Sequence, residues 1–133
     1  PAGEGSALSS GGFLIAPVAT AIDGDDNVYV ANFNQGGIIK ITPDGEQTLL
    51  ASVDAPSGFA IGHMAFANDK LYATSIAAQK IIVIRENGRI SERNRPIDPD
   101  LFPNGLTYDA ANNQILFTYG FGPVSEIEQI QLR

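Results

Sequence analysis

The sequence has no cysteine and no tryptophan, and it contains one methionine, Met64, and one histidine, His63. Without cysteine there is no disulfide framework, no thiolate metal site and no cysteine nucleophile. No run approaches the roughly 18 apolar residues that a membrane helix needs, so we predict no membrane partner. With a single histidine, a serine triad has few ways to form, and the motifs Gly-x-Ser-x-Gly and His-Glu-x-x-His do not occur.

Basic residues are also scarce, with 8 Lys and Arg against 15 Asp and Glu and a net charge of −7. Binding to nucleic-acid phosphates needs a basic face, so we predict no nucleic-acid partner. The 133 residues suffice for one domain, and 44% apolar residues predict an ordered core. The acidic, asparagine-rich and lysine-poor composition favours a secreted or periplasmic location.

An internal repeat of about 43 residues organises the chain. Three stretches align, at 17–31, 61–74 and 103–118. Equivalent positions hold Ile22, Phe66 and Tyr108, and a second set holds Tyr29, Tyr72 and Leu116. Each stretch contains two short apolar runs around an Asp, Asn or Gly turn, which is typical of an antiparallel hairpin.

Each repeat continues with a third apolar run, at 38–41, 80–84 and 127–132. In the first two repeats a turn follows, Asp44-Gly45 or Asn87-Gly88, and then a fourth run at 47–51 or 89–93. Asp-Gly and Asn-Gly between apolar runs are strong hairpin signals. No stretch keeps a helical period over ten residues. The sequence therefore predicts an all-β chain of four-stranded antiparallel units.

Four-stranded units of this length are typical of β-propeller blades. The third repeat lacks its fourth strand, and residues 3–9 align with residues 45–51. The predicted boundaries are an outer strand at 1–12, blades at 13–54 and 55–97, and an incomplete blade at 98–133.

Propeller rings contain four to eight blades, so three blades are half of a six-bladed ring. We predict a head-to-tail homodimer in which the N-terminal strand completes the last blade of the partner. In the alternative interpretation the chain is a piece of a longer propeller, and that strand completes a neighbouring blade.

The repeat also resembles known families. The first repeat reads Asp-Gly-Asp-Asp-Asn-Val-Tyr-Val-Ala-Asn over 23–32, and the third begins Pro-Asn-Gly-Leu-Thr-Tyr-Asp at 103–109. Both are similar to the NHL repeat and to the six-bladed gluconolactonase, or senescence-marker-protein, family. The resemblance covers essentially the whole chain, and it implies a six-bladed propeller fold.

In gluconolactonases a Glu, an Asn and an Asp on innermost strands hold one divalent cation, usually calcium, and the Asn often precedes Gly-Leu. The resemblance therefore implies Asn104 as a metal ligand. The aligned positions in the other repeats are Val18 and Gly62, which have no ligating side chain. Otherwise the sequence requires no cofactor.

Asp23 to Asn27 begins like a calcium-binding loop. However, Val28 stands where such a loop needs glycine, and Asn34 where it needs a bidentate glutamate. We interpret this segment as the turn between the first two strands.

His63 departs from its own repeat, where the equivalent residues are Ala19 and Gly105. At the channel end of an inner strand, His63 is a candidate general base, ligand contact or metal ligand. Loops at that mouth add candidate ligand-binding residues, and the full set is Asn32, Asn34, Gln35, His63, Asn104, Tyr119 and Phe121. The alternatives are a hydrogen-bonded channel histidine without chemistry, and ordinary turn residues and core aromatics in the loops.

Three functions follow from these residues. The first is a binding propeller whose channel-mouth site takes a small polar ligand or a partner peptide. The second is a metal-dependent, lactonase-like hydrolase with Asn104 on the cation and His63 assisting. The third is a fragment or assembly module without a site of its own.

Overall fold

The computed structural model describes residues 3–33, 35–54, 60–76, 78–93, 102–120 and 126–133. Within these ranges the chain forms strands and no helix, so no helix there is long and apolar enough to cross a membrane. The strands are β1 (Pro17–Ile22), β2 (Val28–Asn32), β3 (Gly37–Ile41), β4 (Gln47–Ser52), β5 (Met64–Ala67), β6 (Lys70–Ser75), β7 (Lys80–Arg85), β8 (Ile90–Arg93), β9 (Phe102–Asp109), β10 (Gln114–Gly120) and β11 (Ile127–Gln131).

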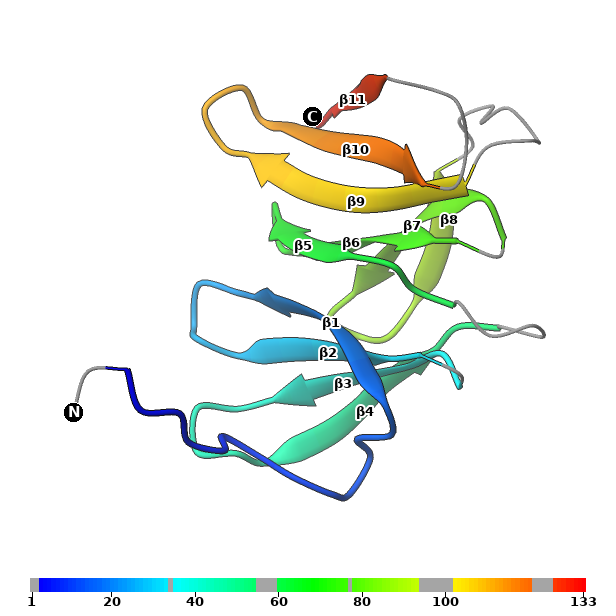
Figure 1. Ribbon diagram of the computed structural model, residues 1–133. Coiled ribbons are helices and arrows are strands. Elements are labelled where there is room, and N and C mark those ends of the chain that lie inside the picture. The colour runs from blue at the N-terminus through cyan, green and yellow to red at the C-terminus, as the bar shows by residue number, and fades with distance from the viewer. Residues whose placement is uncertain (1–2, 34, 55–59, 77, 94–101, 121–125) are drawn as a thin grey trace.

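The strands form three antiparallel sheets in chain order, which we call blades 1, 2 and 3. Blade 1 contains β1–β4, blade 2 contains β5–β8, and blade 3 contains β9–β11. Figure 1 shows the three sheets stacked face to face. The first strands of successive blades, β1, β5 and β9, contact one another and form the inner edge of the stack. This confirms the predicted all-β propeller architecture, with two four-stranded blades and a third of three strands.

The hairpin turns follow from residues that tolerate positive φ. Asn68 and Asp69, between β5 and β6, have φ of 49° and 58°, as a type I′ turn requires at both central positions. Gly45 and Gly88 have φ of 89° and 81° in the predicted Asp-Gly and Asn-Gly turns. Local turn chemistry therefore fixes the register of the outer hairpins.

The segment that begins like a calcium loop is the β1–β2 turn, as predicted. The Asp23 carboxylate accepts hydrogen bonds from the backbone amide of Asn27 (2.9 Å) and the hydroxyl of Tyr29 (2.9 Å). Partial burial alone would raise the pKa of Asp23, but hydrogen bonds from Asn27 and Tyr29 outweigh it and hold the pKa below its usual value. Burial, and then the neighbouring Asp23, raises the pKa of the Tyr29 phenol.

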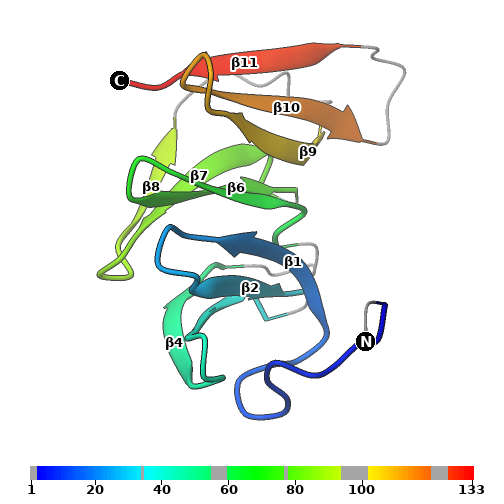
Figure 2. The same cartoon turned by 90° about the vertical axis from the view of Figure 1, so that its left-hand side faces the viewer.

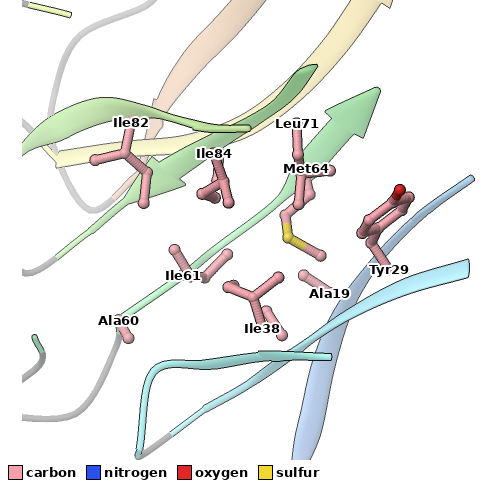
Figure 3. Packing of buried hydrophobic residues seen from close by; sticks show 11 residues of the cluster. Ala19, Tyr29, Ile38, Ala60, Ile61, Met64, Leu71, Ile82 and Ile84 are labelled. Carbon is pink, nitrogen blue, oxygen red and sulfur yellow. The ribbon is translucent and has the colours of Figure 1, made fainter. Parts of the chain in front are cut away.

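Apolar side chains fill the space between the blades. Between blades 1 and 2, Tyr29 stacks on Phe66 with ring centroids 5.5 Å apart, beside Ile38 and Leu71. Figure 3 shows side chains of this cluster meeting between the two sheets. A second cluster between blades 2 and 3 includes Tyr72 and Phe117. Each sheet thus covers a face of the next, because a single sheet cannot bury both of its faces.

The single chain does not test the predicted outer strand over residues 1–12, because its predicted pairing partner belongs to another blade. Residues 3–12 form no strand in the single chain. They run beside blade 1, where the Ser9 hydroxyl donates to the Gly45 carbonyl (2.9 Å) and the Gln47 amide donates to Ser9 Oγ (2.9 Å). The physical reason is geometric, because the free edge of β11 lies at the opposite end of the stack (Figures 1 and 2). Pairing with the β11 of a partner remains a prediction.

Candidate functional site

The candidate site lies where the inner strands of blades 2 and 3 begin. His63 immediately precedes β5, and Asn104 is the third residue of β9. The two residues therefore occupy the same end of neighbouring inner strands, as the repeat predicts.

A buried hydroxyl joins these residues. Thr74 on β6 is fully buried, and its hydroxyl donates to the Asn104 carbonyl oxygen at 2.7 Å. The same hydroxyl accepts the backbone N–H of His63 at 3.0 Å. Thr74 thus fixes the backbone of His63 in blade 2 relative to the backbone of Asn104 in blade 3.

The imidazole ring completes this network. His63 Nδ1 lies 3.1 Å from the Asn104 carbonyl oxygen. A carbonyl oxygen can only accept, so Nδ1 carries a proton and donates it. In the neutral ring Nε2 then keeps its lone pair, and the His63 side chain is exposed. The site therefore presents an oriented imidazole acceptor to solvent.

His63 stands beside a groove of about 380 Å³ along blade 3. The remaining lining residues come from β9, β10 and the start of β11, and they are Gly105, Leu106, Thr107, Leu116, Phe117, Thr118 and Ile127. The groove thus combines a mainly apolar wall with one imidazole.

The side-chain amide of Asn104 sits between two glycines. A Cβ atom added to Gly62 would lie 2.8 Å from Asn104 Oδ1, and one added to Gly120 would lie 3.0 Å from Asn104 Nδ2. Both distances are shorter than ordinary packing allows, so the glycines leave room for this amide.

The described surroundings of Asn104 contain no ligand set for calcium. Ca²⁺ takes six to eight oxygen ligands, with carboxylates among them. Among the described residues, no group of three His, Cys, Asp or Glu side chains could hold a metal ion. Within the described part of the chain, Asn104 therefore has no carboxylate set with which to share a cation.

The structure describes three of the other predicted site residues, Asn32, Gln35 and Tyr119. Asn32 is 3% exposed, and its amide bonds to the backbone of Ile15 (2.9 Å) and Phe13 (2.8 Å), which holds the N-terminal segment on blade 1. Gln35 is exposed in the β2–β3 turn. Tyr119 bonds to the Glu128 carboxylate and makes an edge contact with Phe117. Asn34 and Phe121 lie outside the described residues.

Thr74 is the site residue that sequence reasoning missed. Its signal was available, because Thr74 is the polar residue that follows the apolar run 71–73, and blade 1 has Ala31 at the equivalent position. A buried hydroxyl in a strand needs hydrogen-bond partners, and the partners of the Thr74 hydroxyl are the two residues of the candidate site, His63 and Asn104.

No protein-family model matches the chain, and no curated protein matches it either. Solved structures do match. A catalytically inactive histidine-to-alanine variant of virginiamycin B lyase from Staphylococcus aureus, with quinupristin, is 25% identical over 87% of this chain and has a TM-score of 0.65. A nidogen/laminin complex is 19% identical over 77% of the chain, with a TM-score of 0.63. A streptogramin B lyase is 19% identical over 87%, with a TM-score of 0.59.

These similarities support the fold that the sheets define, which is a partial β-propeller. The chain spans 41%, 39% and 40% of the lengths of these three structures. Three blades thus correspond to about two fifths of each of those chains.

Proposed function

We propose that this chain is a binding module of the propeller class, whose channel-mouth site takes a small polar ligand or a partner peptide through His63. One observation carries the proposal. The Asn104 carbonyl and the Thr74 hydroxyl hold an exposed imidazole in a single tautomer beside a groove. Pre-organising an acceptor in this way lowers the entropy cost of binding.

The groove indicates the chemistry of the ligand. Nε2 of His63 accepts a hydrogen bond, so the ligand carries a hydroxyl or amide donor. Leu106, which also lines the groove, contacts an apolar portion of the same ligand. A peptide segment with one apolar side chain has both features. The similarity to a lyase structure with quinupristin makes quinupristin one probe of this site.

Because His63 is the only histidine, ¹⁵N-histidine labelling reports on this one ring. We expect quinupristin, a short apolar tripeptide amide or D-glucose to shift the Nε2 resonance, and His63→Ala to abolish binding of the active probe. Gln35→Ala is the matched control, because Gln35 is also exposed but lies in blade 1. If no probe moves the ring signal, or if His63→Ala binds as well as the parent, the binding proposal is wrong and the assembly module without a site is favoured.

A second candidate function is catalysis, with His63 as general base. A neutral imidazole whose Nδ1–H is fixed and whose Nε2 is free has the form that proton abstraction needs. The similarity to lyase structures supports this candidate. Mass spectrometry of quinupristin incubated with the chain tests it. Turnover that disappears in His63→Ala supports catalysis, whereas an unchanged substrate contradicts it.

The resemblance to gluconolactonases remains an alternative, and it depends on calcium. Asn104 is the one ligand that the resemblance implies. Glucono-lactone hydrolysis that requires added Ca²⁺ and is lost in Asn104→Ala would support this alternative. Equal rates with and without Ca²⁺ would exclude it.

A further inference from the structure

Exposed apolar side chains gather at the two ends of the blade stack. In the described residues, the large exposed ones are Leu8, Phe13, Ile15, Val18, Ile22, Leu49 and Ile127. The first six belong to the N-terminal segment or to blade 1, and Ile127 begins β11. The faces between blades are covered by neighbouring blades, whereas the outer face of blade 3 carries the open groove.

The repeat shows which residues belong together across a blade interface. Between blades 1 and 2, Tyr29 stacks on Phe66. The equivalent of Tyr29 in blade 3 is Leu116, which lines the groove, and the equivalent of Phe66 in blade 1 is Ile22, which is 57% exposed. Leu116 and Ile22 therefore correspond to the two sides of a blade interface that the described residues of one chain do not form.

The N-terminal segment occupies the place of a fourth strand from a preceding blade. In blade 2, a side chain on Gly88 would collide with the carbonyl oxygen of Leu50 in β4 of blade 1. In blade 1, a side chain on the equivalent Gly45 would collide with the carbonyl oxygen of Leu8. Residues 3–9 align with residues 45–51, so Leu8 is the equivalent of Leu50. The segment thus lies against blade 1 as β4 lies against blade 2.

We propose that a second copy of this chain fills both ends. Blade 3 of one copy packs on blade 1 of the other, with Leu116 against Ile22 of the partner subunit. Residues 3–9 of each copy pair with the free edge of the partner's β11 as its fourth strand. Two such interfaces close a six-bladed ring, and closure removes the exposed sheet edges.

Part of the end face of blade 1 is already covered in the single chain, because Val30, Ile39 and Ile41 are at most 6% exposed and pack with Leu14. A blade of four strands about 4.8 Å apart, each about five residues long at about 3.3 Å per residue, has a flat face of about 300 Å². Two such faces, with a flat area of about 600 Å², are therefore the most that each copy can bury between blades. This is less than the roughly 800 Å² per partner of a standard stable interface, so the pairing of residues 3–9 with the partner's β11 has to add to it.

The ring is independent of whether His63 binds or reacts. In the ring, the partner's blade 1 covers the end of the groove at Leu116 and Ile127. The His63 end of the groove lies toward the ring axis and is not covered. Both copies run in the same direction around the ring, so two His63 side chains face one channel mouth.

Cross-linking tests the interface directly, because the parent chain contains no cysteine. The double variant Ile22→Cys, Leu116→Cys, treated with a short bismaleimide, should give a covalent dimer of about 28 kDa, twice the 14.1 kDa of the chain. Asp26→Cys combined with Leu116→Cys is the matched control, because Asp26 is exposed in the β1–β2 turn. Equal cross-linking of the control, or a ladder of larger species, would overturn the closed ring.

Sedimentation of the unmodified chain gives the second test. We expect a dimer at micromolar concentration. Ile22→Lys should raise the dissociation constant of the dimer about 100-fold, since a buried unpaired charge at an interface centre costs at least about 2–3 kcal/mol. Ile22 is 57% exposed in the single chain, so this variant should keep the parent's far-ultraviolet circular dichroism. A parent chain that sediments as a folded monomer at 100 μM overturns the proposal. This result is also the one expected if blades of a longer chain complete the ring.

Discussion

The hydroxyl of Thr74 offers the sharpest test of how the candidate site is built. Thr74→Val keeps the shape of the side chain but removes the donor to the Asn104 carbonyl (2.7 Å) and the acceptor of the His63 backbone N–H (3.0 Å). The carbonyl keeps a second donor in His63 Nδ1. The main penalty therefore comes from the partly buried His63 N–H. A fully buried donor without a partner costs about 1–3 kcal/mol, so we expect a loss near the lower end of that range.

Thr74→Ser is the matched control, because it keeps the hydroxyl and loses one methyl group, which costs about 0.8 kcal/mol. Urea unfolding at a fixed protein concentration should place Thr74→Val about 1 kcal/mol below the parent. The His63 ring resonances should broaden or move only in the valine variant, because the anchor of its backbone is gone. A valine variant as stable as the parent, with unchanged ring signals, would refute the positioning role of Thr74.

Three further predictions concern the frame around the site. Gly88→Ala should lower the free energy of unfolding in urea by more than about 2 kcal/mol, because the φ of Gly88 is 81° and a backbone carbonyl blocks the Cβ position. Gly24→Ala is the control and should be nearly neutral, since nothing lies within 4 Å of its Cβ position. The folded state holds the pKa of Asp23 below its ordinary value of 3.8. The ionised carboxylate therefore contributes fully to the free energy of unfolding above pH 3.8, and this contribution is lost as the pH falls through the pKa of the folded state. Asp23→Asn should therefore be about 1 kcal/mol less stable than the parent at pH 7, and unfolding measured at pH 2–3 should show a smaller gap; a constant gap would contradict this sign. Asn32→Ala should cost about 2 kcal/mol and speed amide exchange in the segment before β1, and unchanged exchange would contradict the tether.

The repeat made most of the fold predictable. Turn residues with positive φ and apolar runs at a constant spacing placed the strands of all three blades. The strand over residues 1–12 could not be tested by the single chain, because a strand needs a partner edge. That partner edge belongs to another blade, and the alignment of residues 3–9 with 45–51 contains no information on which molecule provides it.

The candidate site was predictable only in outline. The departure of His63 from its repeat marked the right end of the inner strands, and Asn104 lies beside it. The sequence could not show that the backbone carbonyl of Asn104 makes the contact, since every residue has one. It also could not show that Asn32 is buried, because that burial depends on where residues 13–15 cross blade 1.

A crystal structure of the 133-residue chain tests the central claim most directly. We predict a ring of six blades in which residues 3–9 form the outer strand on the partner's β11 and two His63 rings face one channel. Three stacked sheets with both end faces in solvent, or strands that do not radiate from a shared axis, would contradict it.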